Sequence, residues 1–170
     1  SNLVSNGIKA QALSGKDSQI LSGLPIEGLG RVGKISKVNT KPIQDLLEAQ
    51  IVPVIAPLAV DVSGGTGLNI NADLAAAAIS AAYENSTLII MTDVAGIYRS
   101  WPDENSLIRE ISFKELSKLK STFSDGMLPK VQAVLEAIDA GARTVRIIDG
   151  TNDKSFEEAL SGHGGTLVHV

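Results

Sequence analysis

The chain has 170 residues, enough for one domain with a substantial core, and a formal net charge of -4 at pH 7. It has no cysteine and only two histidines, which excludes disulfides, thiolate metal sites and a histidine cluster, so we expect no metal site built by the protein. The sequence has no Lys/Arg stripe and no apolar run of membrane-spanning length, which argues against nucleic-acid and membrane partners. No signal peptide is visible, and we expect a cytoplasmic protein.

The first half of the sequence predicts short strands around one helix. Residues 8–13 form a short apolar strand, and the continuous apolar run of residues 51–56 predicts a strand covered on both faces. Residues 30–39 alternate apolar with small or polar residues, which predicts an extended ribbon. Thr40 is predicted to cap a helix that has Pro42 in its first turn and ends near Gln50.

The second half predicts a regular alternation of helices and strands. Helices are predicted over residues 72–83, 112–119, 126–140 and 155–160, with Gly141 closing the third of them. Strands are predicted over residues 88–91, 144–148 and 166–170. This alternation predicts an α/β fold with a largely parallel sheet.

Gly28, Gly30 and Gly33 form a literal GxGxxG pattern. A dinucleotide site needs a helix directly after this pattern, so that the phosphate meets the helix N-terminus. An alternating extended segment follows here, so we interpret the glycines as a turn. The Walker pattern GxxxxGK[ST] is also absent, and a nucleotide would have to be held in another way.

A glycine-rich loop at residues 63–67 leads into Asn69, Asn71 and Asp73 at the start of a predicted helix. Glycines allow a ligand to approach the backbone closely, and a helix N-terminus attracts anions. The alternative is structural, with Asn71 as the N-cap and Asp73 as a favourable acid in the first turn. Two asparagines and an aspartate within five residues exceed what one cap needs.

Thr92 and Asp93 follow a predicted buried strand, and ligands of open α/β sheets bind beyond the carboxyl ends of strands. An ordinary turn is the alternative interpretation. Lys130 falls in the first turn of its helix, where a cation opposes the helix dipole by about 0.3–1 kcal/mol. Either its side chain extends into solvent, or it meets a bound polyphosphate, with Gly126 and Met127 forming a loop that can lie against a base.

Together these residues resemble the acetylglutamate kinases of the amino-acid kinase family. The matching segments follow the order of the family with about its spacing, and they are residues 13–17, 33–39, 51–55, 67–73, 91–97, 126–131 and 147–150. The NINAD sequence at residues 69–73 and the GMxxK sequence at residues 126–130 are the specific part. The TDVxG sequence at residues 92–96 is shared by many relatives.

The resemblance implies a three-layer αβα sandwich and a reaction in which ATP, with Mg²⁺, phosphorylates the side-chain carboxylate of N-acetyl-L-glutamate for arginine biosynthesis. In that reaction, catalysis is mainly positioning and charge neutralisation. The resemblance also implies roles for individual residues. Asp73 and Lys130 would be catalytic, Asn69 and Asn71 would bind the substrate, and the nucleotide site would contain Thr92, Asp93, Gly96, Gly126 and Met127.

A family member normally begins with a strand carrying a second catalytic lysine, followed by glycine-rich phosphate loops and an arginine for the substrate, and none of these matches here. We therefore expect residues 1–170 to form a single domain, the nucleotide-binding half, with the N-terminal substrate half absent. We expect this half alone not to complete phosphoryl transfer, and to self-associate through uncovered apolar surface. The resemblance implies that the full-length parent is a homo-oligomer.

Two alternatives remain open. The first is a related amino-acid kinase that acts on another carboxylate, such as an aminoadipate derivative, because most substrate contacts of the family lie in the absent front portion. The second is a non-catalytic sensor or binding domain with the same fold.

Overall fold

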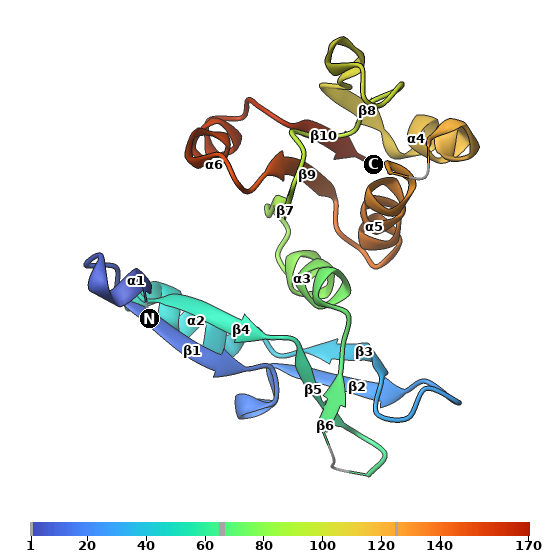
Figure 1. Ribbon diagram of the computed structural model, residues 1–170. Coiled ribbons are helices and arrows are strands. Elements are labelled where there is room, and N and C mark those ends of the chain that lie inside the picture. Colours follow the sequence, from blue (N-terminus) through green and yellow to red (C-terminus); the bar gives the residue numbers. More distant parts are fainter. Residues whose placement is uncertain (1, 65–66, 125) are drawn as a thin grey trace. The chain divides into compact units, whose positions relative to one another are not determined.

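The computed structural model describes residues 2–64, 67–124 and 126–170. Their contacts divide the chain into two units, Ser1–Ala82 and Tyr83–Val170, each with its own helices and sheets (Figure 1). The predicted glycine-rich loop lies partly outside the described residues. The expectation that residues 1–170 form one domain stays a prediction.

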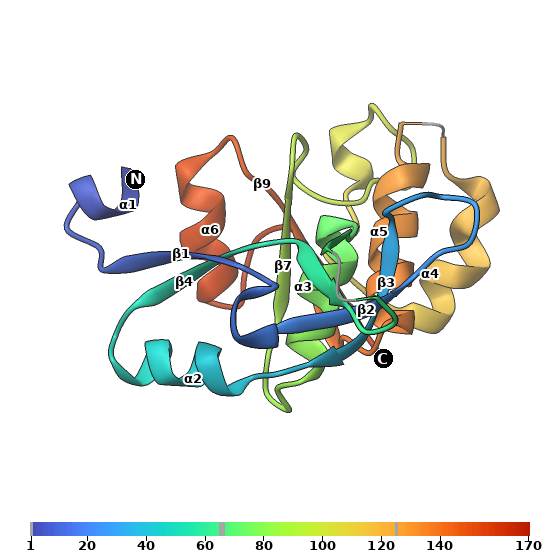
Figure 2. The same ribbon diagram turned by 90° about the horizontal axis from the view of Figure 1, so that it is seen from below.

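The first unit contains a two-stranded parallel sheet. After the short helix α1 (Asn2–Ser5), β1 (Ala10–Ser14) pairs with β4 (Val52–Ala56), and the two strands lie side by side in both views (Figures 1 and 2). The helix α2 (Lys41–Glu48) contacts β4. Thr40 is the N-cap residue of α2, as predicted, but its side chain makes no capping hydrogen bond. The amide N–H of Lys41 donates to Asn39 Oδ1 at 3.3 Å instead.

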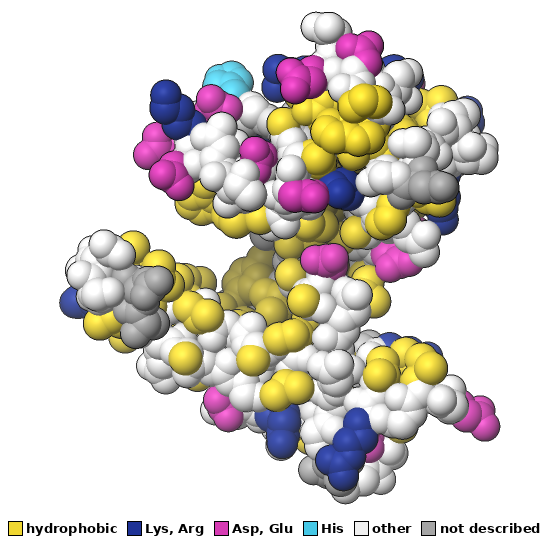
Figure 3. Space-filling model, in the orientation of Figure 1, with side chains coloured by type: hydrophobic (Ala, Val, Ile, Leu, Met, Phe, Trp, Pro, Cys, Tyr) yellow, Lys and Arg dark blue, Asp and Glu magenta, His cyan; other side chains and the backbone are white. Residues whose placement is uncertain are grey.

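The prediction that β4 is covered on both faces is also wrong. Alternate side chains of β4 are exposed, with Val52 at 44% and Val54 at 47% of full exposure, and apolar side chains are visible at the surface in this part of the unit (Figure 3). Within the described residues, β1 is the only strand that pairs with β4. A continuous apolar run therefore indicates a strand here, but it does not indicate what covers that strand.

A second sheet of the first unit has the strand order β3-β2-β5-β6. Its members are β2 (Leu21–Pro25), β3 (Gly33–Val38), β5 (Leu58–Asp61) and β6 (Gly67–Asn69). β2 and β3 are antiparallel, and the loop between them holds Gly28 at φ +79° and Gly30 at φ +63°, which confirms the turn interpretation of the GxGxxG pattern. A short 3₁₀ helix, η1 (Asp17–Gln19), precedes β2, and α3 (Ala72–Ala81) follows β6 and contacts β3.

The second unit contains a four-stranded sheet with the strand order β7-β9-β10-β8. Its strands are β7 (Leu88–Thr92), β8 (Glu110–Ser112), β9 (Thr144–Asp149) and β10 (Thr166–His169). Its helices are α4 (Phe113–Leu119), α5 (Leu128–Asp139) and α6 (Asp153–Leu160), with the 3₁₀ helices η2 (Glu104–Ser106) and η3 (Lys120–Thr122).

Helices cover this sheet on two sides. Both α5 and α6 contact β9, and they lie on opposite sides of it in both views (Figures 1 and 2). The four central residues of β9 are accordingly buried. Gly141 ends α5 at φ +108°, as predicted. Among the described strands, β1–β4, β2–β5, β7–β9 and β8–β10 pair in parallel, and the predicted α/β class with parallel-rich sheets is confirmed.

Candidate functional site

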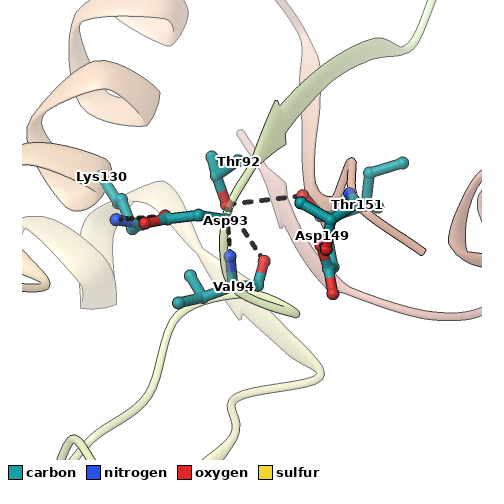
Figure 4. A network of polar contacts seen from close by, with 7 residues as sticks. Thr92, Asp93, Val94, Lys130, Asp149 and Thr151 are labelled. Atoms are coloured by element: carbon teal, nitrogen blue, oxygen red, sulfur yellow. Dashed lines mark hydrogen bonds and ion pairs between the residues drawn. The ribbon is translucent and has the colours of Figure 1, made fainter.

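The carboxyl ends of β7 and β9 meet in the second unit. The strands are parallel, and their register places Thr92 beside Asp149. The hydroxyl of Thr92 accepts from the amide N–H of Val94 at 3.3 Å and can donate to the carbonyl of Val94 at 3.0 Å or of Ile148 at 3.4 Å (Figure 4). The amide of Gly150 donates to the carbonyl of Thr92 at 2.8 Å. The two loops that follow these strands are therefore tied together at Thr92.

Asp149 stabilises its own loop in the same place. Its Oδ1 atom accepts from both the amide N–H of Thr151, at 2.8 Å, and the hydroxyl of Thr151, at 2.6 Å. Asp and Thr therefore close a local turn beyond β9. The loop after β9 has a fixed shape next to Thr92, at the edge of the sheet where α/β proteins bind ligands.

An ion pair joins this edge to the start of α5. The Nζ atom of Lys130 lies 3.0 Å from Asp93 Oδ1 (Figure 4). The Lys130 side chain is only 20% exposed, whereas that of Asp93 is 79% exposed. The pKa of the Asp93 carboxyl is lowered, first because Lys130 donates a hydrogen bond to it, and further by a backbone hydrogen bond and by the charge of Lys130.

Lys130 lies where the sequence predicts it, in the first turn of α5. A cation there opposes the helix dipole, and Asp93 offsets that cost with its negative charge. Because the Lys130 side chain is mostly buried, its ammonium is held at one place at the carboxyl edge of the sheet. The Lys130 ammonium can therefore exchange the Asp93 carboxylate for a phosphate.

Gly126 lies beside an aromatic residue that sequence reasoning missed. A Cβ atom at Gly126 would lie 3.7 Å from Trp101 Cδ1, and the exposed Trp101 ring contacts Tyr98 edge-on with centroids 5.0 Å apart. Trp101 is the only tryptophan of the chain. The sequence shows that Trp101 is unique, but it contains no pattern that connects this residue with the loop at Gly126.

Two other residues predicted to bind nucleotide have clear packing roles. Gly96 is buried, and a Cβ atom there would lie 2.5 Å from Thr166 Oγ1, so only glycine fits. Met127 is 1% exposed and packs in the core, so in this structure its side chain offers no surface to a base. Their nucleotide roles stay predictions.

The acceptor-side candidates belong to the first unit. Asn71 caps α3, because its Oδ1 atom accepts from the amide N–H of Leu74 at 3.1 Å, which confirms the structural interpretation of this residue. Asn69 is exposed at the end of β6, and Asp73 is half-buried in the first turn of α3. Neither the Asn69 nor the Asp73 side chain has a hydrogen-bond or ion-pair partner within the described residues. Their substrate and catalytic roles stay predictions.

Within residues 2–64, 67–124 and 126–170, none of the helices combines the length and the apolar character that crossing a membrane requires. In the same ranges, no three His, Cys, Asp or Glu side chains gather into a group that could hold a metal ion.

Several curated proteins with similar sequences are acetylglutamate kinases. Acetylglutamate kinase from Clostridium acetobutylicum is 39% identical over 173 residues, an alignment that covers 96% of this chain and 58% of the relative. Acetylglutamate kinases from Kineococcus radiotolerans and from an Arthrobacter species are 38% and 39% identical over 98% and 86% of this chain, and these alignments cover 61% and 51% of the two relatives.

Solved structures show the same fold at lower identity. N-acetylglutamate synthase from Neisseria gonorrhoeae, complexed with coenzyme A and N-acetyl-glutamate, matches with a TM-score of 0.78 at 23% identity, covering 99% of this chain and 39% of the synthase. Carbamate kinase from Giardia lamblia, bound to AMP-PNP, matches with a TM-score of 0.66 at 20% identity, covering 99% of this chain and 65% of the kinase. The sequence profile of the amino acid kinase family matches residues 1–149. The chain therefore belongs to the amino acid kinase family.

Proposed function

We propose that the protein to which these residues belong transfers the γ-phosphoryl group of ATP to the side-chain carboxylate of N-acetyl-L-glutamate, in arginine biosynthesis. Residues 1–170 supply the nucleotide-binding half. The observation that carries this proposal is the Asp93–Lys130 pair at the carboxyl edge of the sheet, inside segments that match acetylglutamate kinases. Similarity to a curated acetylglutamate kinase over 96% of this chain supports the choice of acceptor.

On the nucleotide side, Lys130 is the central residue of the proposal. When ATP binds, the Lys130 ammonium leaves Asp93 and contacts phosphate oxygens, because a phosphate carries more charge than a carboxylate. In the reaction, it neutralises charge on the transferring phosphoryl group and on the departing ADP. Thr92, Asp93 and Gly96 line the nucleotide from β7 and its loop, and Gly126 and Met127 line it from the start of α5.

On the acceptor side, no protein nucleophile is required. A carboxylate oxygen of N-acetyl-L-glutamate attacks the γ-phosphorus, the bond to the β-phosphate oxygen breaks, and an acyl phosphate and ADP result. Asn69 and Asn71 hold the acceptor through their amide groups, and Asp73, in the first turn of α3, is the catalytic carboxylate of the first unit. The Asn71 oxygen caps α3, which leaves its NH₂ group for the substrate.

Mg²⁺ would accompany the nucleotide. Magnesium is commonly held by substrate phosphates, water and one or two carboxylates rather than by a protein cage. The described residues fit that mode, because the carboxylates of Asp93 and Asp149 stand at the carboxyl edge of the sheet. When bound, the ion would neutralise phosphate charge. We also propose a cytoplasmic location and a homo-oligomeric intact protein.

Nucleotide binding by this chain can be measured directly. Mg-ADP and Mg-ATP are titrated into residues 1–170 by calorimetry and by the fluorescence of Trp101, which lies beside the loop at Gly126. We expect binding that weakens at least tenfold in Lys130→Met, because one charge-assisted phosphate contact is lost. Lys154→Met is the matched control, since Lys154 is an exposed lysine in the first turn of α6. Equal weakening in both variants would contradict the role of Lys130.

Turnover is tested with the intact natural protein that contains these residues. ATP and N-acetyl-L-glutamate are supplied, and the acyl phosphate is trapped with hydroxylamine. We expect Lys130→Met to lower kcat by about 10²–10³, as for the loss of one group that stabilises transition-state charge. Faster phosphorylation of an aminoadipate derivative would reassign the acceptor. ATP binding without transfer to either acid would support a non-catalytic domain.

A further inference from the structure

Trp101 is a large apolar side chain that the second unit holds at its surface, 41% exposed. The loop that carries it, residues 98–107, is closed at its base by the antiparallel pairing of its first and last residues. Inside the loop, the amide N–H of Arg99 donates to the carbonyl of Ser106 at 2.9 Å, and that of Ser100 donates to the Ser106 hydroxyl at 3.0 Å. An aromatic ring on such a fixed loop offers apolar area to a ligand with little further loss of conformational entropy.

Packing fixes the orientation of the Trp101 ring as well. The buried Tyr98 ring meets it edge-on, with centroids 5.0 Å apart and an interplanar angle of 61°. At its pyrrole edge the indole lies against Gly126, where a Cβ atom would be 3.7 Å from Trp101 Cδ1 and 3.9 Å from its Nε1. Both distances are ordinary van der Waals contacts. Tyr98 and Gly126 therefore hold the ring in place, while its exposed surface stays open to a ligand.

The loop at Gly126 leads directly to Lys130. Gly126 stands four residues before Lys130, which corresponds to about one helical turn, or about 6 Å along a helix axis. The carbonyl of Met127 accepts from the amide N–H of Lys130 at 3.0 Å, so the turn between the two residues is already formed. Trp101 lies against the start of this turn, and the Lys130 ammonium belongs to its end. An aromatic ring and a cation are therefore presented by the same short segment.

A nucleotide needs both of these features. Its phosphates require a cation, which Lys130 supplies in the proposed function, and its base requires an apolar or aromatic surface. Met127 cannot provide that surface, because its side chain is 1% exposed. Among the described residues of α5 and of the loop between β7 and β8, Trp101 is the only exposed large apolar side chain. The surface for a base near Lys130 is therefore the indole ring.

We propose that Trp101 contacts the base of the bound nucleotide and makes the site favour purine over pyrimidine nucleotides. The inference rests on the proposed function, which places the phosphates at Lys130. The exposed part of the indole stacks on the base. A purine gains more from this contact than a pyrimidine does, because its two fused rings cover more of the indole.

The inference is tested by calorimetry on the intact natural protein, with Mg-ADP, Mg-CDP and inorganic tripolyphosphate as ligands. We expect Trp101→Ala to weaken ADP binding about tenfold, because one stacking contact is lost, to weaken CDP binding less, and to leave tripolyphosphate binding unchanged. Trp101→Phe should retain most of the affinity for ADP. Phe156→Ala is the matched control, since Phe156 is an aromatic side chain of α6 with 42% exposure, and it should change none of the three affinities.

The three ligands separate a base contact from a structural role. Tripolyphosphate has no base, so an equal loss of tripolyphosphate and ADP binding in Trp101→Ala would show that the change disturbs the phosphate site, and it would overturn the inference. Unchanged ADP affinity in that variant, or no ADP binding to the wild type, would overturn it too. ADP should also quench tryptophan fluorescence in the wild type but not in Trp101→Phe. A quench that persists in Trp101→Phe would place the base elsewhere.

Turnover distinguishes this inference from the proposed function. Trp101→Ala should raise KM for ATP with little change in kcat, and it should narrow the preference for ATP over CTP, because the base takes no part in the chemistry. Normal turnover with an unchanged KM for ATP would overturn the role of Trp101 and leave the kinase activity standing. ADP binding that depends on Trp101, without any turnover, would refute the kinase activity and leave the base contact standing.

Discussion

Thr166 connects three segments of the second unit through one buried hydroxyl. Its Oγ1 atom accepts from the amide N–H of Ile97 at 2.8 Å and donates to the carbonyl of Ile108 at 2.5 Å. The neighbouring Gly96 approaches so closely that any side chain would collide with this hydroxyl. The loop after β7, which carries several residues of the proposed nucleotide site, is therefore anchored to β10 in the middle of the sheet.

Replacing this hydroxyl should destabilise the fold measurably. Thr166→Val keeps the shape of the side chain but leaves a buried amide and a buried carbonyl without their partner, at a cost of about 1–3 kcal/mol. Urea unfolding followed by circular dichroism measures the change in the free energy of unfolding. Thr122→Val, at an exposed threonine whose hydroxyl donates to Leu119, is the control and should cost less. Equal effects of both changes would contradict the anchoring role.

The Asp93–Lys130 pair should make stability depend on pH in the acid range. The pKa of Asp93 is lowered in the folded protein, so the stabilisation is present above its unfolded pKa of about 3.9 and is lost as pH falls through the folded value. We expect wild type to exceed Asp93→Asn in unfolding free energy at pH 6, and the difference to shrink toward pH 3. A difference that is constant over this range would show that the ion pair does not contribute.

At the scale of single residues, the place of a residue in a helix or turn could be predicted from the sequence, whereas its contact partners could not. The place of Lys130 in the first turn of its helix and the turn at Gly28 and Gly30 were both predictable, because local rules determine them. The ion pair of Lys130 with Asp93 and the hydrogen bond between Ile97 and Thr166 join residues far apart in sequence. Such contacts depend on the packing of strands and helices, which no local pattern encodes.

Among the elements, helices of seven or more residues were predictable, whereas the four-residue helix α1 and the short strands were not. The predicted helices at α2, α3, α4, α5 and α6 are present, with ends within a few residues of the expected ones. The strands β2, β5, β6 and β8 have three to five residues each and no clear alternation, so sequence periodicity missed them. The prediction for β4 was wrong because a continuous apolar run indicates a strand, whereas the burial of that strand depends on which other elements pack against it.

The exposed apolar side chains of β4 lead to a prediction about association. Val52 and Val54 belong to a two-stranded sheet whose surface carries apolar groups, and such surfaces promote contact between molecules. We expect residues 1–170 to self-associate as concentration rises, and we expect Val52→Thr with Val54→Thr to reduce this while preserving strand propensity. Sedimentation velocity measures both. A monomer at all concentrations in the unchanged chain would contradict the prediction.

At the scale of the whole molecule, the second unit has the properties of an independently folding piece. Its four-stranded sheet has helices on both sides, and its core includes Val131, Val145, Ile147 and Val168, all fully buried. We expect Tyr83–Val170, produced alone, to unfold in one cooperative transition, since small units with a single core do so. Thermal unfolding followed by circular dichroism tests this. A gradual loss of signal without a transition would show that the unit needs the rest of the chain.

The strand order of the second unit has a consequence for the protein while it is being made. β10 lies inside the sheet, between β9 and β8, although it comes last of the four strands along the chain. β8 has no other strand partner among the described residues, so it has none until β10 arrives. During synthesis, residues 83–165 can form helices and the β7–β9 pair. The four-stranded sheet is complete only after residue 169 has left the ribosome, because β10 must be inserted between β9 and β8. Until then, β8 and one edge of β9 stay open to chaperones and to neighbouring nascent chains.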